Sequence, residues 1–126
     1  MVLVDTDVLI WYLRGNEKAY KTIETLDGFS LSVVSYMELV QGMRNKKELN
    51  TLRHALYNWN CKILYITEEI SAKAAFIVEH HFLSHSVQLA DALIGSTAIT
   101  YGLPLLTGND KHYKVMRGLQ LKRFRP

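Results

Sequence analysis

The stretch VLVDTDVLI, residues 2–10, joins an apolar run directly to two acids and then returns to apolar residues. A short apolar run bounded by polar residues is typical of a buried strand, and we assign residues 2–5 to one. Residues 8–13 then fit the opening of a helix, with Thr6 or Asp7 placed to cap its free amides. Asp5 therefore stands at the end of a buried strand, where a carboxylate needs a physical explanation.

The rest of the chain repeats this alternation of short apolar strands and helices. Ser35, followed three positions later by Glu38, fits a capping box at the start of a helix. Alternating elements need crossover connections, which build a parallel sheet covered by helices on both faces. The predicted class is α/β, with a central, mainly parallel sheet of four to five strands. Further strands are expected at residues 29–34, 62–66, 103–106 and 119–121, and helices at 17–26, from 35, at 46–58, from 67 and at 86–101.

Length and composition indicate a globular protein. The 126 residues are enough for one hydrophobic core, so we expect residues 1–126 to form a single domain. No apolar run approaches the roughly 20 residues that a membrane span needs, and we expect no membrane association. The one cysteine, Cys61, excludes an internal disulfide. Together with the absence of a secretory signal, this predicts a cytoplasmic location.

Positive charge is concentrated near the C-terminus, although the formal net charge is only +3. Residues 111–126 hold six cations and no acid, which leaves nine cations against twelve acids in residues 1–110. Such a cluster can attract a nucleic-acid backbone, and a solvated C-terminal segment would explain it equally well. The cations are Lys111, Lys114, Arg117, Lys122, Arg123 and Arg125.

Four acids are expected near the carboxyl ends of the strands, where ligands bind in such sheets. They are Asp5, Glu38, Asp91 and Asp110. Three of them have a simpler alternative role, because Asp5 can cap a helix, Glu38 can complete the capping box and Asp110 can belong to a turn. Asp91 is harder to explain this way, because QLADALIGSTA places it among apolar residues of a helix. Converging carboxylates need a cation to offset their repulsion, and oxygen ligands favour Mg²⁺, or Mn²⁺, over zinc. The predicted chemistry is metal-dependent phosphodiester hydrolysis.

Four motifs in order resemble the PIN-domain family, and specifically the VapC toxins of bacterial and archaeal toxin–antitoxin systems. They span nearly the whole chain: VLVDTDVLI, VVSYMELVQG, QLADALIGSTA and LPLLTGNDKHY. The resemblance implies a PIN-like three-layer sandwich and a Mg²⁺-dependent ribonuclease. It also implies an RNA substrate, often a structured RNA such as tRNA, a VapB-type antitoxin as partner, and a homodimer.

The family's acidic residues fall on Asp5, Glu38 and Asp91 of this sequence. The fourth family position falls on Asn109, and we prefer the adjacent Asp110 as the acid. Thr6 and Thr107 resemble the hydroxyl residues that support water and metal in such sites. Asp7 stands where many relatives have Asn, and it is expected to cap the following helix while holding Asp5. The residues expected to bind RNA are Lys111, Lys114, Arg117, Arg123 and Arg125.

Three other interpretations of the sequence stay open at this point. A strand ending in Asp-x-Asp also fits a phosphatase of the haloacid dehalogenase type, in which Asp5 and Asp7 would both be catalytic. A non-catalytic RNA-binding PIN module would keep the fold and the basic C-terminus. The histidines of EHHFLSH, His80, His81 and His85, suggest a zinc site, but no third ligand with suitable spacing accompanies the pair His81 and His85.

Overall fold

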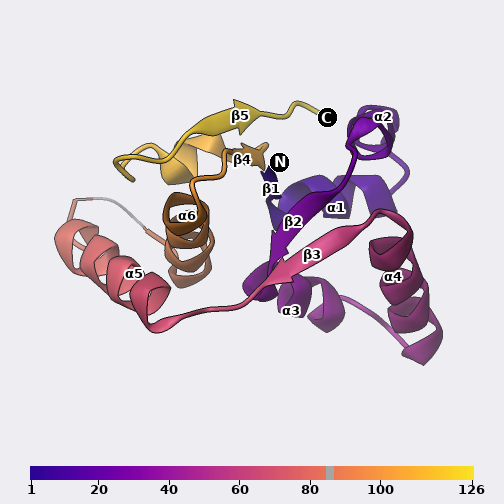
Figure 1. Ribbon diagram of the computed structural model, residues 1–126, viewed down its shortest axis with the longest axis horizontal. Helices are drawn as coiled ribbons and strands as arrows, with labels where there is room; N and C mark the ends of the chain where they lie inside the picture. Colours follow the sequence, from indigo (N-terminus) through magenta and orange to yellow (C-terminus); the bar gives the residue numbers. More distant parts are fainter. Residues whose placement is uncertain (85–86) are drawn as a thin grey trace.

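A parallel sheet of five strands lies at the centre of the computed structural model, which describes residues 1–84 and 87–126 (Figure 1). Within these residues the strand order is β3-β2-β1-β4-β5, and each neighbouring pair is parallel. The predicted α/β class and the mainly parallel sheet of four to five strands are therefore confirmed. The strands are β1 (Leu3–Val4), β2 (Phe29–Ser32), β3 (Cys61–Leu64), β4 (Leu105–Thr107) and β5 (Leu121–Arg123).

Helices cover both faces of the sheet and make three layers (Figure 1). One hydrophobic core lies between the sheet and α1 (Thr6–Leu13), α2 (Glu17–Thr25) and α4 (Lys46–Asn58). The other lies between the sheet and α5 (Glu68–His81) and α6 (Leu89–Tyr101). The remaining helix, α3 (Val33–Gln41), follows β2 and packs Leu39 into the first core.

The apolar run at the N-terminus is explained by these two cores. Val2 and Val4 are buried in the first core, whereas Leu3, which points the opposite way, is buried in the second. Leu105 and Leu106 divide in the same manner on β4, with Leu105 in the second core. Because both faces of β1 are covered, this strand has no polar face, and its sequence reads as a continuous apolar run.

Side-chain caps move several element boundaries from their predicted places. The N-cap of α1 is Asp5, whose carboxylate accepts from the Thr6 amide, so the prediction of Thr6 or Asp7 was wrong. The N-cap of α3 is Ser32 and not Ser35, because the Ser32 hydroxyl accepts from the Val34 amide and ends β2 two residues early.

The predicted helix at residues 46–58 matches α4 at both ends, and several other boundaries differ by one to three residues. The strands β3, β4 and β5 are shifted along the chain from residues 62–66, 103–106 and 119–121. The helix expected at residues 86–101 begins at Leu89, and Ser86 lies outside the described residues. A 3-10 helix, η1 (Asp110–Tyr113), follows β4 in a stretch where no helix was expected. Differences of this size are expected, because the ends of an element are less sharply defined than its middle.

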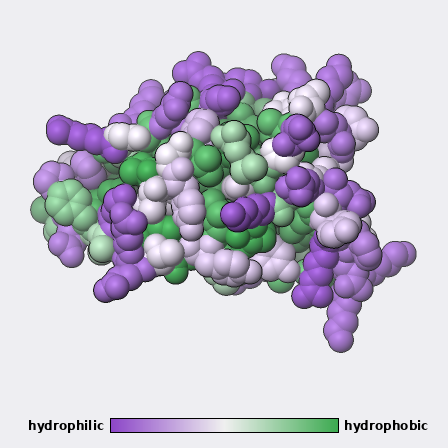
Figure 2. Space-filling model, viewed as in Figure 1, coloured by the Kyte–Doolittle hydropathy of each residue, from purple (hydrophilic) through white to green (hydrophobic). Residues whose placement is uncertain are grey.

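The chain reverses its direction of winding at β1, whose two neighbours are β2 and β4. The crevice at the carboxyl ends of β1 and β4 is therefore the place where such a sheet binds ligands. Among the described residues, no helix is both long and apolar enough to cross a membrane. In the view of Figure 2, hydrophilic side chains surround the molecule, including the region over α4, and hydrophobic residues show through the middle of the face.

Candidate active site

Asp5 lies at the carboxyl end of β1 and is held by three hydrogen bonds. Its Oδ1 accepts from the Thr6 amide at 2.8 Å, and its Oδ2 accepts from the Thr107 hydroxyl at 2.8 Å and the Tyr113 hydroxyl at 3.0 Å. Burial raises the pKa of Asp5 to about 7, and the negative charge of Asp7 adds to this effect. The three donors lower the pKa in part. Asp5 is thus a fixed carboxylate that is costly to ionise without a cation.

Asp91 approaches Asp5 from the first turn of α6. The Tyr113 hydroxyl lies 3.3 Å from Asp91 Oδ1 as well as 3.0 Å from Asp5 Oδ2. The two carboxylate oxygens are therefore no farther apart than the sum of these distances, about 6.3 Å. Burial also raises the pKa of Asp91, which the nearby His112 opposes, with Nδ1 at 3.3 Å from Asp91 Oδ2. Two acids that are 86 positions apart in the sequence meet at one hydroxyl.

Glu38 is connected to this pair through Thr6. The Thr6 hydroxyl donates to Glu38 Oε1 at 2.7 Å and lies 2.8 Å from the Ser35 hydroxyl. Ser35 and Glu38 share one face of α3, because they are three positions apart in a helix. The predicted capping box is therefore absent, and both side chains turn instead toward the residue that follows Asp5.

Asp110 lies at the start of η1 and is paired with two arginines. Arg123 Nη2 is 3.3 Å from its Oδ2, and Arg125 Nη2 is 3.0 Å from its Oδ1. The hydrogen bond from Arg125 is the largest cause of a lowered pKa at Asp110. Parallel pairing of β4 with β5 sets Arg123 opposite Thr107, which brings the basic C-terminus to this acid. Both oxygens of Asp110 thus already face a cation of the protein itself.

Asp7 forms a hydrogen bond with the loop that follows β4. Asp7 Oδ2 accepts from the Gly108 amide at 2.9 Å, whereas its Oδ1 is buried without a hydrogen-bond partner. Asp7 therefore links α1 to the loop after β4, and the expectation that it caps α1 and holds Asp5 was wrong. Asn109 donates its backbone amide to Thr107 Oγ1 at 2.9 Å, which orients the hydroxyl toward Asp5.

Comparison with known proteins decides the family. The family model of the PIN domain matches residues 2–118 of this chain. This chain belongs to the PIN-domain family. It is 34% identical to "Ribonuclease VapC10" of Mycobacterium tuberculosis over 95% of this chain and 91% of the relative. It is 30% identical to "Ribonuclease VapC1" of Methanocaldococcus jannaschii over 96% and 85%. Among solved structures it resembles "Toxin-antitoxin complex from Klebsiella pneumoniae", with a TM-score of 0.75, 25% identity, and 94% and 95% coverage.

The predicted resemblance to VapC proteins is thus confirmed, and the comparisons lend no support to a haloacid dehalogenase phosphatase. The geometry of this PIN domain also argues against the phosphatase. Asp7, which would be its second catalytic acid, uses one oxygen to hold the Gly108 amide and buries the other.

A divalent cation fits the pair Asp5 and Asp91. Asp5 is buried and Asp91 is partly buried, burial raises the pKa of both carboxyls, and a shared cation would offset the cost of ionising them together. In the part of the chain that the structure describes, no group of three or more His, Cys, Asp and Glu side chains is arranged to hold a metal ion. Two carboxylates suit Mg²⁺, because this ion usually keeps several water ligands and takes only one or two carboxylates from the protein.

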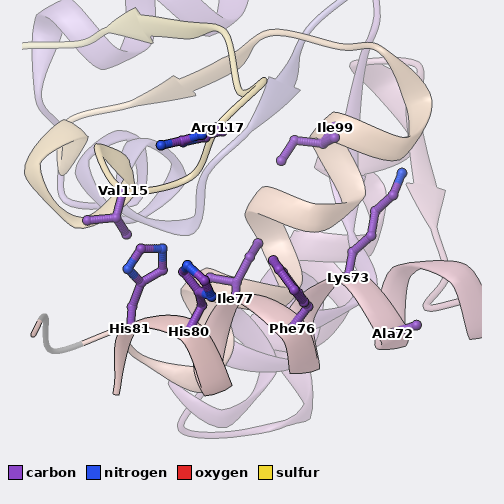
Figure 3. A pocket seen from close by; sticks show the side chains of 9 residues that line it. All are labelled: Ala72, Lys73, Phe76, Ile77, His80, His81, Ile99, Val115 and Arg117. Atoms are coloured by element: carbon purple, nitrogen blue, oxygen red, sulfur yellow. The ribbon is translucent and has the colours of Figure 1, made fainter. Parts of the chain in front are cut away.

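Some basic residues near the C-terminus of this PIN domain line one of two hollows. Lys111, His112 and Arg125 line one of about 400 Å³ beside Asp110. Arg117 lines another of about 720 Å³ between α5, α6 and the segment before β5, on an apolar floor that includes Phe76 (Figure 3). Lys114 is exposed.

The histidines of EHHFLSH also lie apart from the acids. His80 and His81 end α5 and line the larger hollow (Figure 3). The His80 ring stacks on Phe76, with ring centroids 5.2 Å apart. His85 lies outside the described residues.

Sequence reasoning missed Tyr113, His112 and Ser35 as parts of the site. Tyr113 is buried to 1% exposure, yet it lies in a basic stretch that resembles a solvated tail. The sequence does show an aromatic residue three positions after Asp110. If a helix begins at Asp110, this spacing places Tyr113 in its first turn, near the acid. That signal does not say which buried group the hydroxyl meets.

Proposed function

We propose that this PIN-domain protein is a metal-dependent ribonuclease and the toxin of a VapBC-type toxin–antitoxin pair. The observation that carries the proposal is the meeting of Asp5 and Asp91 at the Tyr113 hydroxyl, at the carboxyl ends of β1 and β4. The names of the two VapC relatives support ribonuclease activity. The raised pKa values of both acids support the binding of a cation between them.

Asp5 and Asp91 are the residues that would hold Mg²⁺, with Mn²⁺ as a substitute. A bound Mg²⁺ supplies charge that offsets the phosphodiester and acidifies a water molecule. Glu38 is fixed through Oε1 by Thr6, and in the proposed reaction its Oε2 orients the attacking water. Thr107 keeps Asp5 in place. Asp110 acts through Arg123 and Arg125, which it holds beside the site.

The substrate backbone would lie along the basic C-terminal segment. Lys111 and Arg125 line the hollow next to Asp110, and Arg123 is paired with the same acid. Cations in this position attract phosphates and orient the chain without reading its bases. Lys114 and Arg117 extend the positive charge farther along the segment. The RNA target is proposed to be a structured RNA such as tRNA, as in the family.

The proposed partner is a VapB-type antitoxin, and the proposed assembly is a homodimer. The solved relative described as a toxin–antitoxin complex, at 25% identity over 94% of this chain, supports the first of these. The test is co-expression of this chain with the product of a neighbouring small gene, followed by co-purification and by light scattering of the toxin alone.

Ribonuclease activity is tested with purified protein and total RNA, in Mg²⁺ and in EDTA. We expect cleavage only with the metal, and loss of cleavage in Asp5→Asn and Asp91→Asn. Asp27→Asn is the matched control, because Asp27 is an exposed turn residue. Cleavage that persists in EDTA and in both variants would refute the proposal. RNA binding without cleavage in any metal would favour the non-catalytic module.

A further inference from the structure

Tyr113 stands out because a buried tyrosine reaches both acids of the proposed metal site. It ends η1, is 1% exposed, and directs its hydroxyl to Asp5 Oδ2 at 3.0 Å and Asp91 Oδ1 at 3.3 Å. A hydroxyl has a single proton, so the shorter distance makes Asp5 the main acceptor. Tyr113 therefore controls which part of Asp5 remains available to a ligand.

The position of Tyr113 is built into α6. Gly95 lies four residues after Asp91 and hence on the same face of the helix. A Cβ at Gly95 would collide with Met116 Sδ and would lie 3.5 Å from Tyr113 Cδ1. The missing side chain lets η1 and Met116 pack directly on α6. This packing holds the Tyr113 ring against α6, with its hydroxyl next to Asp91.

The hydrogen bonds of Asp5 leave one of its oxygens with room for a further ligand. A carboxylate has about four lone-pair sites, two on each oxygen. Thr107 and Tyr113 fill both sites on Oδ2, whereas the Thr6 amide fills one on Oδ1. One site remains, and it is on Oδ1. A cation can then bind Asp5 through a single oxygen only.

We propose that Tyr113 is a positioning residue that sets the metal preference of the site, by restricting Asp5 to single-oxygen coordination. This inference rests on the proposed function to the extent that Asp5 and Asp91 bind a divalent cation. Mg²⁺ is small and octahedral and takes carboxylates through one oxygen, whereas Ca²⁺ takes six to eight ligands and readily binds both oxygens of a carboxylate. A blocked Oδ2 therefore favours Mg²⁺ over Ca²⁺.

Tyr113→Phe tests the role of the hydroxyl, because the ring that packs on α6 is kept. The dissociation constants of Mg²⁺ and Ca²⁺ are measured by titration calorimetry on metal-free protein, without RNA. We expect the preference for Mg²⁺ over Ca²⁺ to fall by roughly tenfold, the value of one hydrogen bond to a charged group. A general loss of stability would weaken the binding of both cations alike. A change in the ratio of the two dissociation constants therefore reports the positioning role of the hydroxyl.

Two further variants complete the experiment. Thr107→Val removes the other donor to Oδ2 and is expected to change the ratio in the same direction, so it carries the test if Tyr113→Phe does not fold. Tyr57→Phe is the control, because Tyr57 is 85% exposed, and it should leave the ratio as in the wild type. A wild type that binds both cations, with an unchanged ratio in Tyr113→Phe and Thr107→Val, overturns the role of Tyr113 alone. A wild type that binds neither cation overturns the proposed metal site as well.

Discussion

Asp5→Asn is expected to stabilise the metal-free protein at neutral and alkaline pH. Burial raises the pKa of Asp5 from 3.8 to about 7, so the folded protein keeps a proton that the unfolded chain releases. The free energy of unfolding therefore falls as the pH rises from 3.8 to about 7, and this loss is complete above that range. The pKa of Asp5 differs by about three units between the folded and the unfolded chain, which lowers the free energy of unfolding above this pH range by on the order of 4 kcal/mol.

An asparagine fits the hydrogen bonds around position 5. Its side-chain oxygen can accept from the Thr6 amide, as Asp5 Oδ1 does. Its NH₂ group would then face the hydroxyls of Thr107 and Tyr113, which can rotate to accept in place of donating. The substitution thus removes the buried charge without leaving a donor opposite a donor.

Urea unfolding in EDTA at pH 5 and pH 8 measures the effect. Between these pH values we expect the wild type to lose roughly 2–3 kcal/mol more stability than Asp5→Asn. Burial also raises the pKa values of Asp7 and Asp91, so these acids make the free energy of unfolding fall with pH by a similar amount in both proteins. The difference between the two proteins therefore reports the ionisation of Asp5. Mg²⁺ at pH 8 should stabilise the wild type and not the variant. An equal pH dependence in both proteins would show that Asp5 ionises normally, and the argument for a charge-offsetting cation would be refuted.

Three shorter predictions concern the surroundings of the site. Asp7→Asn should keep ribonuclease activity, and it should unfold at higher urea concentration than the wild type at pH 8, because burial raises the pKa of Asp7; a phosphatase activity of the wild type that this variant abolishes would favour the haloacid dehalogenase alternative. Gly108→Ala should lower the free energy of unfolding by about 1–3 kcal/mol, because its Cβ would lie 2.6 Å from Asp7 Oδ2; an unchanged urea midpoint would contradict this packing. Lys111→Ala should raise KM for RNA more than it lowers kcat and should reduce the salt dependence of binding; equal changes in KM and kcat would argue against a backbone contact.

The local pattern of the sequence was enough for the class of fold and for two of the acids. Continuous apolar runs alternating with helical periodicity predicted a parallel sheet, because strands buried on both faces have no polar positions. Asp5 could be placed at the end of β1 by the same pattern, and Asp91 could be recognised because an acid interrupts the apolar surface of α6. The boundary errors at α3 arose because the β-branched residues Val33 and Val34 favour a strand locally, whereas the Ser32 cap starts a helix there.

Contacts between distant segments decided the rest of the site. Asp5 and Tyr113 are 108 positions apart, and their hydrogen bond depends on how closely η1 packs on Gly95. Asp110 has arginine partners because β5 pairs in parallel with β4, which no local pattern of charges specifies. Periodicity records only which side of an element is buried. Which side chains meet there depends on strand order, register and the space left by a missing Cβ, and these exist only in the folded chain.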